Sequence, residues 1–140
     1  MTCLACAYIA GDEADMGRVI TALLIFVGII HLLPLPGVLV AEQLATLYGV
    51  AIEDPSLEIL MRHRAILFGL LGSFMVYAAF KPPLQVLAIA GGLASVVSFI
   101  AISWAVVDYN DVIHKVVIAD IIAAIALVIA GILRIPRAYA

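Results

Sequence analysis

Residues 84–107, LQVLAIAGGLASVVSFIAISWAVV, form a run of 24 residues without one charged side chain. About 20 apolar residues in a helix are enough to cross the hydrocarbon core of a bilayer, so this run predicts a membrane-spanning helix. The rest of the chain has the same character, because 66% of its 140 residues are hydrophobic and only 12% are charged. A soluble domain of this length could not bury so many apolar side chains, so we expect lipid to surround much of the surface.

Three further apolar runs accompany this one. Pro34 and Pro36 end the first run, because proline lacks an N–H group and disfavours helix in the residue before it. Asp54-Pro55 is typical of a helix start, with a capping side chain followed by proline. We therefore predict an all-α, integral membrane four-helix up-down bundle with a short interfacial helix between helices 1 and 2. The predicted spanning helices cover about 18–33, 55–80, 84–107 and 111–133, the interfacial helix about 39–49, and a single transmembrane domain 1–140.

Two of the spanning runs are too short to cross without carrying charge into the lipid. Only 16 uncharged residues separate Arg64 from Lys81, and only 13 separate Asp120 from Arg134. These stretches give helices of about 24 and 20 Å, whereas the hydrocarbon core is about 30 Å thick. Arg64 and Asp120 are therefore predicted at membrane depth. Each lies ten residues after an expected capping residue, at positions 54 and 110, so we expect them at a similar level.

Two arginines of the second spanning helix are candidates for pairing with Asp120. Depth favours Arg64, whereas helix phase favours Arg62, which shares its face with small residues that let helices approach closely. The sequence leaves the choice open. The small residues on the face of Arg62 are Ala65, Gly69 and Gly72, and the side chains on the face of Arg64 are Phe68, Leu71 and Met75.

Ionisable residues at membrane depth are costly and are functional candidates by default. Two interpretations fit the cluster expected near the outer end of the bundle. The first is a polar pocket that holds a lipid-like or quinone-like head group or passes protons. The second is a buried ion pair that fixes helix register, with the histidines merely interfacial. The predicted cluster consists of Arg62, His63, Arg64, Asp120, His31 and His114.

Several other chemistries lack a supporting pattern. The three histidines come from three helices and form no H-x-x-E or H-x-x-x-H pair, so no metal site is predicted, and the sequence requires no cofactor. Cys3 and Cys6 form a lone C-x-x-C pair near the N-terminus, which we expect to be mobile and without a structural role. The seven basic residues are scattered, which argues against nucleic acid as a partner. No catalytic residue is predicted.

The distribution of charge predicts an orientation in the membrane. Arg18, Lys81, Arg134 and Arg137 lie at one end of the predicted bundle, whereas the 34–58 loop at the other end is acidic. The positive-inside rule then places both termini in the cytoplasm and the acidic loop outside.

Three short stretches carry a resemblance to a known family. They are Leu47-Tyr48-Gly49-Val50, Met61-Arg62-His63-Arg64-Ala65 and Phe68-Gly69-Leu70-Leu71-Gly72. With the four-helix layout, they resemble the DoxX-like small four-helix bacterial membrane proteins. The resemblance implies an inner-membrane bundle, sometimes associated with redox or quinone-linked partners, and it assigns no catalytic residue.

These observations lead to a functional prediction. We expect a multi-pass membrane protein without enzymatic activity of its own, acting as an accessory subunit or as a binding module for a small lipid-like or quinone-like ligand. The alternatives are a redox-linked enzyme component that uses quinone or haem, and a small proton-coupled transporter. The expected partners are the lipid bilayer and either other membrane subunits or further copies of the chain.

Overall fold

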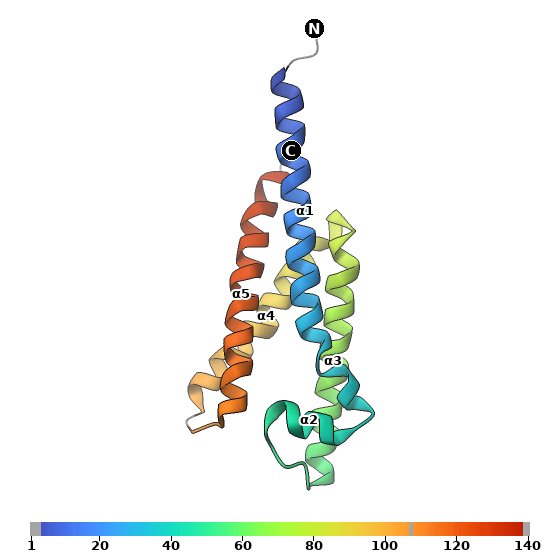
Figure 1. Cartoon of the computed structure of the whole chain (residues 1–140), viewed down its shortest axis with the longest axis vertical. Helices are drawn as coiled ribbons and strands as arrows, with labels where there is room; N and C mark the ends of the chain where they lie inside the picture. The colour runs from blue at the N-terminus through green and yellow to red at the C-terminus, as the bar shows by residue number, and fades with distance from the viewer. Residues whose placement is uncertain (1–3, 107, 139–140) are drawn as a thin grey trace.

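The computed structural model describes the backbone of residues 4–106 and 108–138 and the side chains of residues 15–106 and 108–135. This part of the chain is helical and contains no strand, which confirms the predicted all-α class. Four helices are long and apolar enough to cross a membrane, so the protein is a multi-pass membrane protein. The elements are α1 (Leu4–Leu32), the 3-10 helix η1 (Leu35–Val38), α2 (Ala41–Tyr48), α3 (Pro55–Ala79), α4 (Pro82–Ala105) and α5 (Asp111–Ala138) (Figure 1).

Two helices extend beyond the bounds expected from sequence. α1 begins at Leu4 instead of near residue 18, because the acidic residues that precede the apolar run are compatible with a helix that continues outside the lipid. α5 continues through Pro136 to Ala138 instead of ending near residue 133. A proline this close to the helix end removes one backbone hydrogen bond without preventing the last turn. Of the N-terminal cysteines, Cys3 lies outside the described residues, and Cys6 lies in α1 with its side chain outside them.

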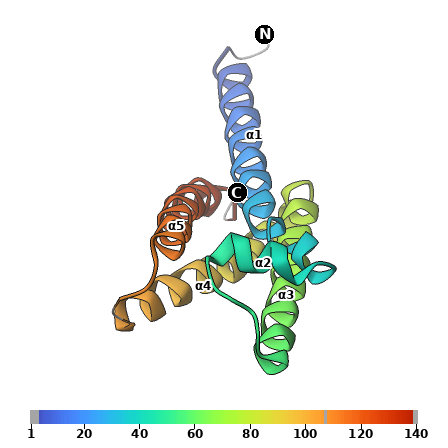
Figure 2. The same cartoon turned by 60° about the horizontal axis from the view of Figure 1, so that its bottom comes forward.

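The four long helices form a ring in which α1 packs against α3 and α5, and α4 packs against the same two helices. The start of α1 and the end of α5 lie toward the same end of the bundle (Figure 1). We call this the terminal end; the turn between α3 and α4 also belongs to it. α4 begins there beside the end of α3 and crosses diagonally to reach the start of α5 (Figures 1 and 2). The short helix α2 lies across the opposite end, here called the α2 end, and contacts both α3 and α5.

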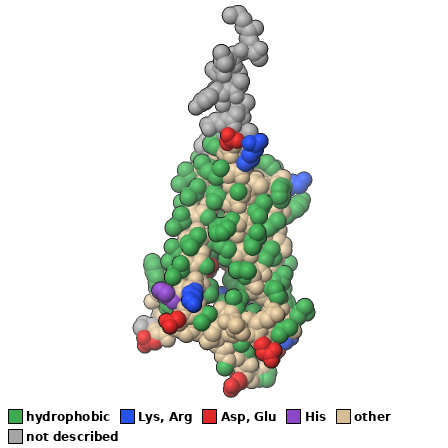
Figure 3. Space-filling model, in the orientation of Figure 1, with side chains coloured by type: hydrophobic (Ala, Val, Ile, Leu, Met, Phe, Trp, Pro, Cys, Tyr) green, Lys and Arg blue, Asp and Glu red, His purple; other side chains and the backbone are tan. Residues whose placement is uncertain are grey.

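The core is tightly packed from the terminal end to the middle of the bundle. Where α1 crosses α3, Gly28 faces Gly72, and a Cβ atom added at Gly72 would lie 2.6 Å from the Gly28 carbonyl oxygen. The two backbones could not approach so closely with larger residues. Outside, hydrophobic side chains cover the flanks and charged side chains gather at the two ends (Figure 3), as expected for a lipid-exposed surface. The core of this part consists of Ile20, Leu24, Val27, Met75, Ala78, Ala79, Ala88, Ile89, Val96, Ala123, Ala126, Leu127 and Ala130, and a smaller buried cluster at the α2 end consists of Leu44, Tyr48 and Ala65.

Two capping residues fix where α3 and α5 begin at the α2 end. The Asp54 carboxylate accepts a hydrogen bond of 2.7 Å from the Ser56 N–H group, which lowers the pKa of Asp54. Asn110 accepts a bond of 2.8 Å from the Ile113 N–H group and caps α5. Its Nδ2 group also donates to the carbonyl oxygens of Tyr48 and Gly49, at 3.1 and 3.0 Å. Asn110 therefore joins the end of α2 to the start of α5.

Candidate functional site

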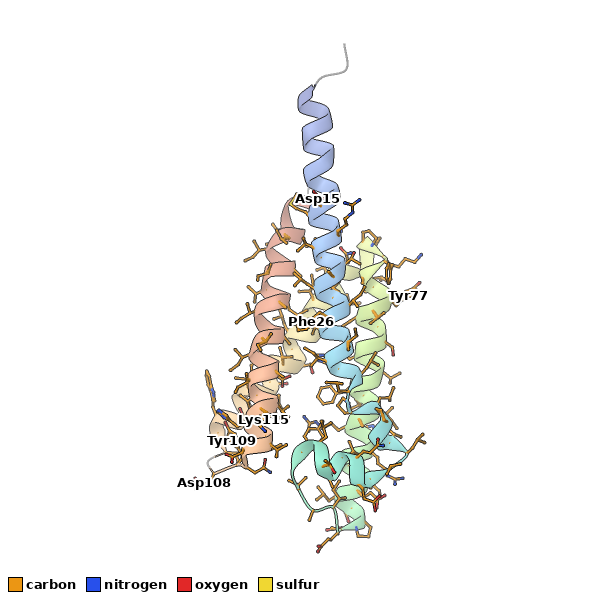
Figure 4. All side chains as sticks on the ribbon, viewed as in Figure 1. Asp15, Phe26, Tyr77, Asp108, Tyr109 and Lys115 are labelled. Atoms are coloured by element: carbon orange, nitrogen blue, oxygen red, sulfur yellow. The ribbon has the colours of Figure 1, made fainter. Side chains whose placement is uncertain are left out.

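A cavity of about 460 Å³ lies at the α2 end, where the four-helix ring is less tightly closed. The end of α1, the last turn of α2, the middle of α3 and the first half of α5 form its walls. Figure 4 shows Lys115, one of the lining residues, near the start of α5, and Figure 3 shows a hollow in this part of the surface. The lining is mainly apolar with a few polar groups, as in many sites for small molecules. The lining residues are Ile30, His31, Leu33, Thr46, Leu47, Tyr48, Arg64, Phe68, Val112, Lys115, Val116, Ala119 and Asp120.

Arg64 lies among three aromatic rings. Its guanidinium carbon is 4.8 Å from the centroid of the Tyr48 ring, 4.9 Å from that of Phe68 and 5.0 Å from that of Phe99. The rings come from α2, α3 and α4, and the negative faces of aromatic rings attract a cation that has lost part of its hydration. Burial raises the pKa of the Tyr48 phenol, although the nearby Arg64 charge opposes this effect. The phenol therefore stays protonated and keeps its O–H group as a hydrogen-bond donor.

Asp120 lines the same cavity from α5. It lies ten residues after its cap Asn110, as Arg64 lies ten residues after its cap Asp54. At about 1.5 Å per residue, both are about 15 Å along their helices. Two apolar spanning helices thus bring charged groups of opposite sign, Arg64 and Asp120, to a common cavity, which Lys115 of α5 also lines.

The expected direct ion pair of Asp120 with an arginine is not found among the described residues. The ion pairs of these residues are Arg62–Glu58, at 2.7 Å, and Arg18–Asp15, at 3.0 Å. Arg62 binds Glu58 because helical side chains lean toward the N-terminus, which brings residues four apart together. The interpretation from helix phase, which favoured Arg62 as the partner, was therefore wrong. Arg64, favoured by depth, shares the cavity with Asp120 but is held by aromatic rings.

The histidines do not form one cluster. His31 lines the cavity and is only 3% exposed, with its ring edge against Phe68 at 5.5 Å between centroids. Its Nδ1 atom lies 3.0 Å from the carbonyl oxygen of Val27. A carbonyl can only accept, so Nδ1 carries the hydrogen and Nε2 of the neutral ring is an acceptor. His63 and His114 are exposed and do not line the cavity, and His114 stacks on Tyr109.

The site also contains residues that the sequence did not mark. Phe68 lies four residues after Arg64, so helix phase put the two on one face without showing that they would be in contact. Tyr48 ends α2, and Lys115 lies near the start of α5. The hydrogen bond from Asn110 to the Tyr48 carbonyl oxygen, between residues 62 apart in sequence, joins these two elements. Phe99 reaches Arg64 from α4, and no local signal could have indicated this contact. Among the described side chains, no three histidine, cysteine or acidic residues gather as a metal site would require.

Comparison with known proteins adds no assignment to this geometry. No protein-family model, curated protein or solved structure matches the chain.

Proposed function

We propose that the cavity at the α2 end binds a small amphipathic molecule, lipid-like or quinone-like, and that the protein acts without enzymatic activity of its own, as a binding module or accessory subunit. The observation that carries the proposal is that Arg64 and Asp120 line one cavity with mainly apolar walls. Charged groups at membrane depth are costly unless they are paired or hydrogen-bonded. A polar head group between them would accept from one and donate to the other.

The polar groups of the walls favour one kind of head group. Arg64 supplies N–H donors, and its position among three rings leaves a planar, weakly hydrated cation. Asp120 supplies an acceptor when ionised, and the Nε2 atom of His31 is a second acceptor. A head group with both a carbonyl and a hydroxyl group fits this set, with an apolar tail along Ile30, Leu33 and the lipid.

The orientation of the bundle completes the proposal. Arg18, Lys81 and Arg134 lie at the terminal end, whereas the α2 end carries most of the acidic side chains among the described residues. The positive-inside rule favours a cytoplasmic terminal end. The cavity then lies in the outer half of the bilayer. The resemblance to DoxX-like proteins, which remains a prediction, favours a bacterial inner membrane.

The test is purification of the full chain from native membranes in mild detergent, followed by mass spectrometry of the extracted small molecules. We expect one amphipathic compound to co-purify with the wild type and to be lost from Arg64→Gln and Asp120→Asn. Ala119→Leu, which adds bulk to the cavity wall, should also lose it. Arg62→Gln is the matched control, because Arg62 lies two residues away on the same helix and binds Glu58 outside the cavity.

Two outcomes would contradict the proposal. If Arg64→Gln and Arg62→Gln retain the compound equally, the cavity is not its site. If the purified wild type shows a haem absorbance band, or catalyses quinone reduction alone, the redox alternative replaces the binding module.

A further inference from the structure

A second concave surface lies at the terminal end, on the opposite side of the packed core from the cavity. It is a groove of about 370 Å³ between the first half of α4 and the last part of α5. This volume is within the range of about 300 to 1,000 Å³ common for small-molecule sites. The residues that line it are Val86, Ile89, Ala90, Leu93, Gly131, Arg134 and Ile135.

The groove is apolar and faces the lipid. Val86 and Ile135 at its edges are 55% and 60% exposed, on helices that cross the membrane, whereas Ile89 inside it is buried. Gly131 keeps the groove deep, because a Cβ atom added there would meet nothing closer than the Ile89 Cγ2 atom at 3.7 Å. The surrounding solvent of such a groove is hydrocarbon, so its shape suits an acyl chain.

Arg134 places a positive charge at the end of this groove. Its guanidinium donates a hydrogen bond of 3.2 Å to the carbonyl oxygen of Pro82, in the first turn of α4. Its Nε atom is buried without a hydrogen-bond partner among the described residues. Lys81 directly precedes Pro82 and adds a second positive charge, and the N-terminus of α4 adds the partial positive charge of the helix dipole.

The acidic side chain described at this end does not neutralise these charges. Asp15 is bound to Arg18, at 3.0 Å, on the separate helix α1. Among the described side chains, the terminal end therefore joins an apolar groove to a local excess of positive charge, which we expect at the depth of the lipid head groups. Basic sites between membrane helices bind anionic lipids through this combination.

We propose that the groove between α4 and α5 binds an anionic phospholipid of the surrounding leaflet. One acyl chain lies along Ile89 and Leu93, and the phosphate lies against Arg134, with Lys81 as a second cationic contact. The site is independent of the cavity at the α2 end and of the ligand proposed there.

The test compares two lipids with identical acyl chains, phosphatidylglycerol and phosphatidylcholine, added to the purified full chain in detergent. Native mass spectrometry measures the bound lipid, and thermal unfolding measures the stabilisation that a bound ligand confers. We expect wild type to prefer phosphatidylglycerol. Arg134→Gln, which keeps a donor for Pro82 and removes the charge, should lower its affinity roughly five-fold, and Arg134→Lys should retain most of it.

Two further variants keep the test independent of the folding of Arg134→Gln. Lys81→Gln should also weaken the binding of phosphatidylglycerol. Gly131→Leu should weaken the binding of both lipids, because the leucine side chain fills the groove. Arg18→Gln is the control, since Arg18 lies at the same end on α1 and does not line the groove.

Equal binding of the two lipids to wild type would overturn the proposal, as would unchanged binding in both Lys81→Gln and Gly131→Leu. Displacement of phosphatidylglycerol by inorganic phosphate would also overturn it, because the site would then recognise a free anion and not a membrane lipid.

Discussion

The two ends of the bundle use the same helices in opposite ways. From the terminal end to the middle, small and aliphatic side chains of all four long helices fill the interior, and α1 crosses α3 at the contact of Gly28 and Gly72. At the α2 end, α4 has moved away from α3, and the short helix α2 covers the opening. The difference shows that one apolar sequence can build both a close-packed core and a cavity, depending on how far the helices diverge.

The charged side chains follow this division. A charged side chain in the packed part would have neither an oppositely charged partner nor water around it. Arg64 and Asp120 instead lie where α2 and the diverging helices leave room. The packed part should therefore determine stability and the α2 end should determine ligand binding. The following variants test that separation, from the largest expected effect to the smallest.

Leu127→Ala should produce the largest loss of stability. Leu127 is fully buried in the core, and truncation of such a leucine leaves a cavity that costs about 2 to 5 kcal/mol. Denaturant titration in mixed micelles measures the free energy of unfolding. Leu70→Ala is the control, because Leu70 is 63% exposed on α3. Equal losses in both variants would show that the terminal part is not packed as described.

Gly72→Ala should cost about 1 to 3 kcal/mol, because the added methyl group would overlap the Gly28 carbonyl oxygen, which cannot move without shifting α1. Gly91→Ala is the matched control: its new Cβ would lie 3.5 Å from the Leu71 Cδ1 atom, an ordinary contact. Alanine is also the better helix former, so this variant should be as stable as wild type or slightly more stable. The midpoint of thermal unfolding in detergent compares them, and a stable Gly72→Ala protein would refute the close crossing.

Asn110→Ala should have the smallest effect on stability, about 1 to 2 kcal/mol, and a distinct effect on the site. The change removes the cap of α5 and both hydrogen bonds to the end of α2. Asn110→Asp keeps the capping oxygen and loses only the Nδ2 donor. Both variants should lose the co-purifying ligand, whereas Asp54→Ala, which loses only the cap of α3, should retain it. Retention by Asn110→Ala would separate α2 from the binding site.

The relative level of Arg64 and Asp120 along their helices could be predicted from the sequence better than their contacts. The levels of Arg64 and Asp120 followed from counting, because caps are local signals and the rise of a helix is constant. Helix phase favoured Arg62 because its small neighbours indicate how close two backbones come, but its own long side chain leans back to Glu58. A polar pocket was one interpretation of the sequence, but its walls could not be predicted, since they depend on the diagonal course of α4 and on packing between distant segments, such as the contact of Phe99 with Arg64.

The hydrogen bonds of Asn110 have a consequence for how a molecule reaches the cavity. They hold the end of α2 to the start of α5, so α2 cannot move away from α5 without breaking both bonds. Among the described residues, no hydrogen bond joins α1 to α5, and Leu33 at that side is 61% exposed. We therefore expect a ligand to enter sideways from the bilayer, between α1 and α5. A ligand would then have to dissolve in the membrane before Arg64 could recognise it, so membrane solubility would be the first condition that selects what the protein binds.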